Sequence, residues 1–274
     1  MVGRWVDFTD KSLLEQAHAR MTKTLVDGIQ IDMSTEECKK LLRRHIYTKI
    51  NLVTLFVDIN NSTEMSLTLP ETKFALILQS FAQELTIAIS GYGGYVFKYE
   101  GDAVIALFPT EYNEEKACRN ALDCSRAILR IINEIINPAF NTNQLPQITV
   151  RIGMAYGYAL VVLYGKSLEN SHIDVVGSSI SLATKIASIA NPNQILIGES
   201  IYNIFQSSAS SLSSSVAKRR RRTTTTTAAG LSPKDLSNYN TGTAGFREIE
   251  VDPTKWKYLS RSDPHSLYRV YESY

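Results

Sequence analysis

The pattern of apolar and polar positions predicts strands and helices in alternation. An apolar run forms most of the strand expected at residues 51–58, and a helix entered at Pro70 follows it. Three glycines close that helix, at Gly91, Gly93 and Gly94. Its apolar side chains recur at helical spacing, at Phe74, Ile77, Leu78, Phe81, Leu85 and Ala88.

The same pattern continues to about residue 205. The further elements expected, in order, are a hairpin at 95–108 turning at Gly101, a helix at 113–136, a second hairpin from strands at 148–157 and 158–165, a helix at 178–190, a strand at 194–198 and a short helix. The resulting βαββαβ order with added β and α elements predicts an α/β sandwich of the ferredoxin-like type. Its sheet should be mostly antiparallel and covered by helices.

Both ends of the chain differ from this core. Residues 1–50 predict an N-terminal extension of two polar amphipathic helices, which would pack on the domain at 51–274 or on a partner. Residues 206–245 are rich in Ser, Thr and Ala and predict a mobile insertion within that domain, because they cannot bury enough apolar area. Residues 266–274 alternate and predict a strand that returns to the sheet.

Composition adds limits on compartment and partners. An apolar content of 44% is enough for a core, and the formal charge of +2 would be −3 without Lys218 and the four arginines at 219–222. The three cysteines lack metal or disulfide spacing, which fits a reducing compartment. We expect no signal peptide and no membrane span, since no run reaches about 20 apolar residues. A cytoplasmic protein is therefore expected.

Two carboxylates are the first candidate chemistry. Asp58 ends the first strand and Asp102 lies at the turn of the hairpin, so the sheet can bring them to one edge. Converging carboxylates repel unless a divalent cation binds them, and Mg²⁺ takes one or two carboxylates while leaving positions for phosphates and water. The polar residues after Asp58, which are Asn60, Asn61, Ser62 and Thr63, could offer backbone N–H groups to an anion. The alternative is that both aspartates only stabilise turns.

At these residues the chain resembles the class III nucleotidyl cyclase catalytic domain. The resemblance covers about 52–205 and the last strand, and it rests on four segments in the right order. These are TLFVDINNST, GGYVFKYEGDAVIALF, VRIGMAYG and DVVGSSISLATKIASIANPNQILI. Any one of them alone would be weak support.

The resemblance implies roles for individual residues. Asp58, Asp102 and the backbone carbonyl of Ile59 would bind two Mg²⁺ or Mn²⁺ ions, while Lys98 and Asp174 would read the purine. Lysine only donates and a carboxylate only accepts, which suits adenine and favours ATP over GTP. The family shares each active site between two subunits, so a head-to-tail homodimer is expected. The alternative for Lys98 and Asp174 is a plain ion pair.

The chain also departs from the family pattern. The positions of a ribose-orienting Asn and a phosphate-binding Arg hold Ser181 and Lys185, which share one helix face. Serine is shorter than asparagine, and lysine lacks the planar fork of arginine. Tyr158 replaces a basic residue of some relatives, and the further phosphate-binding cation could be Lys257 or Arg261. The alternatives are a helix-interior Ser bonded to a carbonyl and a solvated Lys.

The expected activity is an adenylate cyclase that converts ATP to 3′,5′-cyclic AMP and pyrophosphate, slowed by Ser181 and Lys185. The alternative is a catalytically silent cyclase-homology domain that binds a nucleotide and regulates. A third reading is a nucleic-acid binder, based on Phe97, Tyr99 and the arginines at 219–222. We consider this one unlikely, because a basic Ser/Thr tract is more often a solvated loop.

Overall fold

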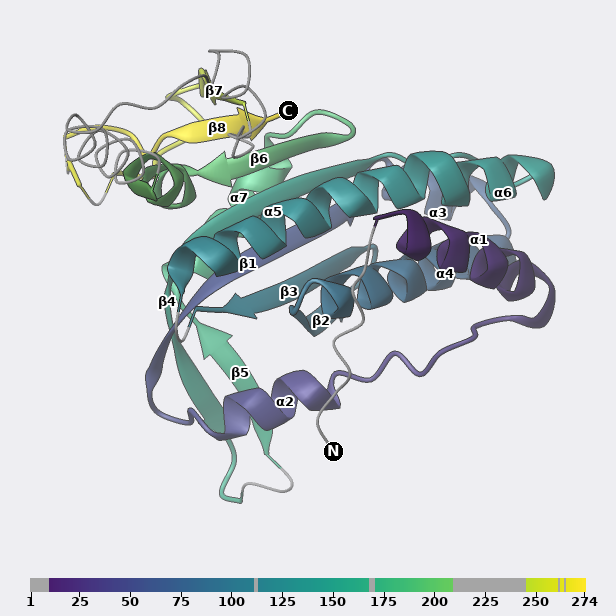
Figure 1. Cartoon of the computed structure of the whole chain (residues 1–274), viewed down its shortest axis with the longest axis horizontal. Helices are drawn as coiled ribbons and strands as arrows, with labels where there is room; N and C mark the ends of the chain where they lie inside the picture. The colour runs from purple at the N-terminus through teal and green to yellow at the C-terminus, as the bar shows by residue number, and fades with distance from the viewer. Residues whose placement is uncertain (1–9, 111–112, 168–170, 209–244, 261, 264) are drawn as a thin grey trace, which may run out of the picture.

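The structure is a computed structural model that describes residues 10–110, 113–167, 171–208, 245–260, 262–263 and 265–274. It is an α/β sandwich around one mostly antiparallel sheet (Figure 1). The strands, in sheet order, are β2 (Tyr95–Glu100), β3 (Ala103–Pro109), β1 (Lys49–Ile59), β4 (Val150–Tyr164), β6 (Gln194–Gly198), β8 (Val270–Ser273) and β7 (Phe246–Ile249), with β5 (His172–Val176) paired to β4. The expected fold class is confirmed.

Strand β1 is the central strand because its side chains are apolar on both faces. Residues 52–57 are all buried, and antiparallel ladders to β3 and β4 flank the strand. Strands β4 and β6 pair in parallel, which the helix between them makes possible. The sheet therefore holds the end of β1 between two neighbouring strands.

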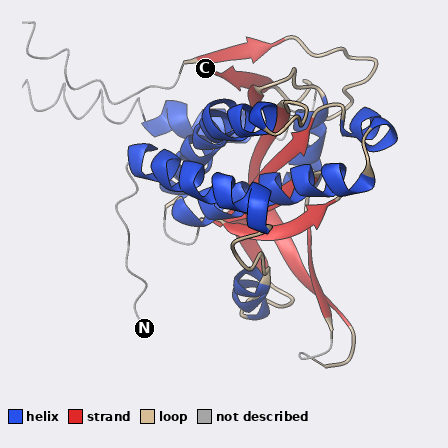
Figure 2. Cartoon of the chain, turned by 90° about the vertical axis from the view of Figure 1, so that its right-hand side faces the viewer, coloured by secondary structure: helices blue, strands red, loops and turns tan. Residues whose placement is uncertain are grey.

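Helices cover the two faces of the sheet and form two apolar cores (Figure 2). The first core lies under α1 (Asp10–Asp27), α4 (Glu71–Gly91), α5 (Glu114–Ile131), the π-helix η1 (Ile132–Ile136) and α6 (Asn137–Thr142). The second lies under α2 (Glu36–Arg43), α7 (Ser178–Ser188) and the segment that contains Trp256. The short α3 (Ser62–Thr68) follows β1 directly and buries none of its residues.

The N-terminal helices pack on this domain at two separate places. Helix α1 buries Leu13, Ala17 and Met21 in the first core, and α2 contacts β2 and β5 on the other face (Figure 1). Arg20 of α1 donates from Nε and Nη2 to the two carboxylate oxygens of Glu84 on α4, at 3.2 and 2.7 Å. Since the Glu84 side chain is fully buried, this ion pair holds α1 in place.

Two expectations about element boundaries were wrong. The segment expected as a hairpin at 148–165 is the single strand β4, because Gly157 and Tyr158 stay in register with Leu52 and Asn51 of β1. Strand β5 makes the hairpin instead, against the second half of β4. The helix expected at 113–136 continues through η1 to Thr142, and the π-turn comes directly before Pro138, which has no N–H to donate.

Other expectations agree with the structure or lie outside it. Helices occupy 178–188 and 199–208, and β8 pairs with β6 close to the expected last strand. Strand β7, which pairs with β8, has no counterpart in the sequence pattern as interpreted above. Most of the stretch expected as a mobile insertion, residues 209–244, lies outside the described residues.

Helix α4 is long and apolar enough to cross a membrane by length and composition, although polar and charged side chains interrupt its apolar residues. The helix packs in the first core and carries the buried Glu84 that pairs with Arg20. These contacts are those of a core helix in a sandwich. Among the described residues no second helix passes the same test.

The buried ion pair gives a stability prediction. Arg20→Met keeps the side-chain stem and leaves Glu84 charged and unpaired in the core, so we expect a loss of about 3–5 kcal/mol in the free energy of unfolding. Urea denaturation followed by circular dichroism measures it. The matched control is Lys39→Met, which breaks an exposed pair with Glu36 and should cost less than about 1 kcal/mol. Equal losses for the two variants would contradict the role given to Arg20.

Candidate active site

The two aspartates predicted from the sequence lie side by side. The antiparallel ladder pairs Asp58 with Ala103, so Asp102 is next to Asp58 at the end of β1. The backbone N–H of Ile59 donates to the carbonyl of Asp102 at 3.3 Å, which fixes the hairpin turn against the strand. The left-handed conformation of Gly101 allows that turn.

The local environment disfavours charge on Asp58. Burial, the neighbouring charge of Asp102 and a hydrogen bond with Asp102 raise the pKa of Asp58 to about 6, against the lowering effect of Arg151. An acid whose pKa is raised by a second acid is a typical site for a cation, which removes the repulsion. The geometry therefore fits the predicted metal-binding role better than that of a turn residue.

Arg151 is a site residue that the sequence reasoning missed. It lies opposite Asp58 in the β1–β4 ladder, and its Nη2 donates to the Asp58 carboxylate. Its Nε is buried and has no partner among the described residues. An arginine among the apolar, buried residues at the start of β4 was the available signal, because a partly buried cation needs an acidic partner.

A groove opens beside the carboxylates. Its volume is about 540 Å³, and its lining includes Asn61, Ser62, Thr63 and Arg151. Ser62 donates its hydroxyl proton to Asp102, which ties the start of α3 to the hairpin. The backbone N–H of Asn60 donates to the carbonyl of Thr149 at 2.8 Å, so the expectation that Asn60 offers this group to an anion was wrong.

The donor set suits a divalent ion that arrives with phosphates. The described residues contain no group of three or more His, Cys, Asp or Glu side chains that could hold a metal by themselves. Two carboxylates and the backbone of Ile59, the last residue of β1, are the kind of ligands that Mg²⁺ uses when phosphates and water complete its coordination. The residues present thus fit a Mg²⁺ or Mn²⁺ ion that binds together with the phosphates of a ligand.

Lys98 and Asp174 form an ion pair, which is the alternative to base reading that the sequence left open for them. The Lys98 ammonium lies 2.9 and 2.8 Å from the two Asp174 carboxylate oxygens, which joins β2 to β5. Burial would raise the pKa of Asp174, but hydrogen bonds from Lys98 and from the Val175 N–H lower it below the ordinary value. Asp174 is therefore ionised at neutral pH, and both side chains keep about a quarter of their surface exposed (29% for Lys98 and 23% for Asp174).

The two residues that depart from the family pattern are exposed on α7. Ser181 and Lys185 lie one turn apart on the same side of the helix. The opposite side of α7 packs closely on β4, where a Cβ at Gly153 would come within 2.3 Å of the Ala183 carbonyl oxygen. Of the proposed further cations, Lys257 is exposed and Arg261 lies outside the described residues.

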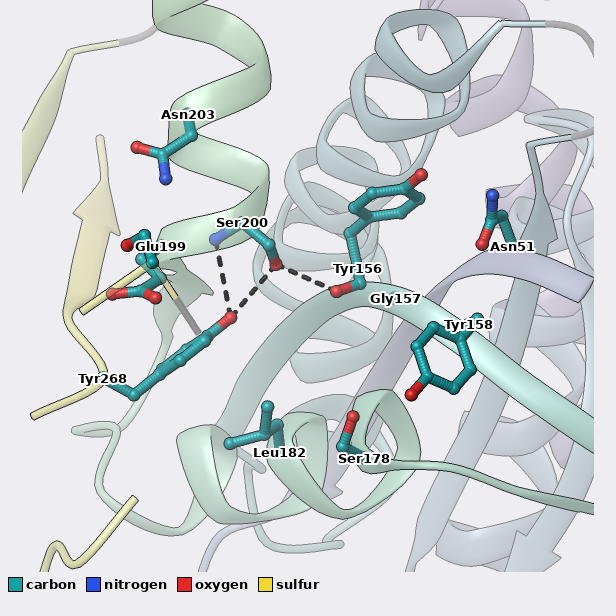
Figure 3. Close-up of a pocket in the computed structure, with 11 residues that line it drawn as sticks. Asn51, Tyr156, Gly157, Tyr158, Ser178, Leu182, Glu199, Ser200, Asn203 and Tyr268 are labelled. Carbon is teal, nitrogen blue, oxygen red and sulfur yellow. Dashed lines mark hydrogen bonds between the residues drawn. The ribbon is translucent and has the colours of Figure 1, made fainter. Parts of the chain in front are cut away.

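A second pocket lies between α7, β4 and the helix at 199–208 (Figure 3). It has a volume of about 280 Å³, and none of the predicted site residues lines it. Figure 3 shows the hydroxyl of Ser200 bonded to the Tyr156 carbonyl and to the hydroxyl of Tyr268. Glu199 binds the Ser260 hydroxyl and the Arg269 N–H. These polar groups satisfy one another, so the pocket is a structural feature beside the site.

Comparisons with known proteins agree with this site. The model of the adenylate and guanylate cyclase catalytic domain family matches residues 45–227. A cytidylate cyclase from Escherichia coli is 27% identical over 157 residues, covering 55% of this chain and 34% of that protein. An adenylate cyclase from Anabaena cylindrica is 31% identical over 151 residues, covering 54% and 29%. The chain thus spans about a third of the length of these curated relatives.

Solved structures show the same fold. The adenylyl cyclase CyaB from P. aeruginosa matches with a TM-score of 0.59 at 19% identity, over 83% of this chain and 95% of that chain. The guanylate cyclase domain of RhGC from Catenaria anguillulae, in complex with GTP, matches with a TM-score of 0.58 at 16% identity, over 83% and 98%.

The fold and the family match together define a nucleotidyl cyclase catalytic domain. With the family match over most of its length, the chain belongs to the adenylate and guanylate cyclase catalytic domain family, as the resemblance implied.

The raised pKa of Asp58 gives a prediction for the protein in a buffer that contains a metal chelator. Because this pKa exceeds the ordinary 3.8, the ionised carboxylate weakens the fold above about pH 6, and the penalty fades as pH falls toward 4. Asp58→Asn should therefore raise Tm relative to the parent more at pH 8 than at pH 5. The difference should be on the order of 2 kcal/mol, which is a few degrees.

The exposed Asp27→Asn is the matched control and should change Tm equally at both pH values. Mn²⁺ with ATP should raise the Tm of the parent at pH 8 and leave that of Asp58→Asn almost unchanged. A Mn²⁺ shift of equal size in the parent and in Asp58→Asn would rule out Asp58 as a ligand.

Proposed function

We propose that this domain is an adenylate cyclase, which converts ATP to 3′,5′-cyclic AMP and pyrophosphate at the interface of a head-to-tail homodimer. The observation that carries the proposal is the pairing of Asp58 with Asp102 at the end of β1, next to a groove that Arg151 lines. In the reaction the ribose 3′-oxygen forms a bond to the α-phosphorus. The bond between that phosphorus and the bridging oxygen of pyrophosphate breaks.

Each active site would use metal-binding and phosphate-binding residues of one chain together with base-binding residues of its partner. Asp58, Asp102 and the Ile59 carbonyl would hold two Mg²⁺ or Mn²⁺ ions, which when bound supply charge neutralisation and a lower pKa for the 3′-hydroxyl. Arg151 and the backbone of Asn61, Ser62 and Thr63 would bind phosphate oxygens in the groove.

The partner chain would supply the base-reading pair and the helix residues. Lys98 and Asp174 would read the adenine, Ser181 would contact the ribose and Lys185 the α-phosphate. Since Ser181 and Lys185 are weaker donors than Asn and Arg, turnover should be slow. The three cysteines are buried free thiols, which supports a reducing compartment such as the cytoplasm.

The second candidate is a catalytically silent domain that binds a nucleotide. The observation that favours it is the replacement of both helix residues, Ser181 and Lys185, on the exposed side of α7. The paired carboxylates favour the enzyme, because a site that only binds a base has less need of two metal ligands.

Cyclic AMP formation from Mn²⁺ and ATP by the purified chain tests the enzyme directly. We expect product from the parent and at least about a hundredfold less from Asp58→Asn or Asp102→Asn, because each removes a metal ligand. Light scattering should first establish a dimer, and Asp27→Asn serves as the control that keeps its rate. A verified dimer whose product does not exceed that of Asp58→Asn would leave the silent domain as the function.

The shared site predicts complementation between two inactive variants. A dimer of one Asp58→Asn chain and one Lys98→Ala chain has one site with both intact residues. Mixing and re-equilibrating the two variants should therefore restore about a quarter of the parent rate, since half the dimers are mixed and each has one intact site. A mixture as inactive as its components would contradict the head-to-tail arrangement.

A further inference from the structure

The base-reading pair is fixed in place by several contacts. Both carboxylate oxygens of Asp174 bind Lys98, and one of them also accepts the Val175 N–H at 2.7 Å. The Lys98 ammonium lies 4.8 Å from the centre of the Phe97 ring. The His172 Nε2 lies 3.6 Å from the Asp174 carboxylate. The pair therefore places a donor beside an acceptor, with the acceptor held by its own strand and the donor on a flexible stem.

This pair specifies a pattern of hydrogen-bonding groups. A lysine ammonium can only donate and an ionised carboxylate can only accept. The complementary edge has a ring nitrogen that accepts next to an exocyclic amine that donates. Adenine has this edge at N1 and N6, and cytosine has it at N3 and N4. Guanine and uracil have the reverse, a ring N–H beside a carbonyl oxygen.

The size of the base is a separate matter from its polarity. The Lys98 ammonium is carried on a flexible stem of four carbons, so it can follow an edge that lies nearer the ribose in a pyrimidine. Asp174 is held by its own strand, but part of its surface is exposed and open to an amine from either ring. The Lys98 ammonium and the Asp174 carboxylate would thus select a base edge that carries an amine over one that carries a carbonyl oxygen.

On the basis of the proposed function, we infer that this cyclase takes the amino-bearing nucleotides as a class, so CTP is a substrate along with ATP, while GTP and UTP are rejected. A mismatched base would leave Lys98 facing a ring N–H and Asp174 facing a carbonyl oxygen, which is repulsive for both. The comparisons include relatives named cytidylate cyclase, one named adenylate cyclase and one named uridylate cyclase, so the choice of base follows from the groups of the pair and not from these names.

Initial rates with the four nucleoside triphosphates and Mn²⁺ test the inference. We expect ATP and CTP to react within about tenfold of each other, and GTP and UTP at least about a hundredfold more slowly, because unpaired polar groups exclude the wrong base. Rejection of CTP as strong as that of GTP would overturn the inference, since ring size would then decide. So would GTP or UTP rates comparable to that of ATP.

Binding separates this inference from the proposed function. The 3′-deoxy forms of the four triphosphates lack the attacking hydroxyl, so titration calorimetry measures base recognition without turnover. No cyclic product from any nucleotide, with the 3′-deoxy forms of ATP and CTP still bound in preference, would remove the enzyme and keep the recognition. Product formation without that preference would do the reverse.

Asp174→Asn identifies the residue that carries the selection. An amide both donates and accepts, so we expect the preference for ATP and CTP over GTP and UTP to fall by about tenfold or more. The matched control is His172→Gln, which removes the imidazole beside Asp174 and should keep the order of the four substrates. A uniform loss with all four nucleotides in Asp174→Asn would show a purely structural role and overturn the assignment.

Discussion

The ladder between β1 and β3 determines where the two carboxylates meet. It places Asp58 opposite Ala103, and the turn before Ala103 then brings Asp102 to the same end. A slip of one residue would turn every β1 side chain to the opposite face, and the two close-packed cores, each fitted to its own set of β1 side chains, oppose that exchange. The apolar core therefore enforces the contact between two groups that repel each other, and burial together with this repulsion raises the pKa of Asp58.

The N-terminal segment reaches the same hairpin from the other side. The linker at 28–35 joins α1, which the buried Arg20–Glu84 pair anchors, to α2 on the opposite face. Met33 of this linker and residues 101–104 of the hairpin line one small cavity of about 190 Å³. Helix α2 in turn packs on β2 and β5, the strands that carry Lys98 and Asp174. The segment before the sheet is thus in contact with the elements that hold both halves of the site.

Local patterns were sufficient for most of the fold, and the failures have physical causes. The strands β1, β2 and β3 and the helix α4 follow from periodicity and from glycines at their ends. Gly157 indicated a turn, but β1 on one side holds β4 straight through it. The π-turn before Pro138 depends on packing in the first core. Strand β7 is short and is stabilised by its pairing with β8, which lies 20 or more residues away.

Most residues of the candidate site, like most elements of the fold, could be expected from the sequence. The pairs Asp58–Asp102 and Lys98–Asp174 could be expected because each follows from a motif of the family. Arg151 was missed because its partner, Asp58, is 93 residues away and only the register of β4 joins them. The N–H of Asn60 was expected to be available, and a backbone bond to Thr149 that no local pattern indicates takes it instead.

The packing of α7 limits how the chain can compensate for Ser181 and Lys185. Gly153 brings β4 against the backbone of α7 so closely that the helix cannot move nearer to the sheet, and buried Ala183 and Ala187 leave it little freedom to rotate. The distance to the ribose and the phosphate must then be spanned by the side chains of Ser181 and Lys185 themselves. Lys185 is long enough to bring its charge to a phosphate, whereas Ser181 has a single hydroxyl close to the helix. Weakened orientation of the ribose, more than lost charge, is therefore the expected cause of slow turnover.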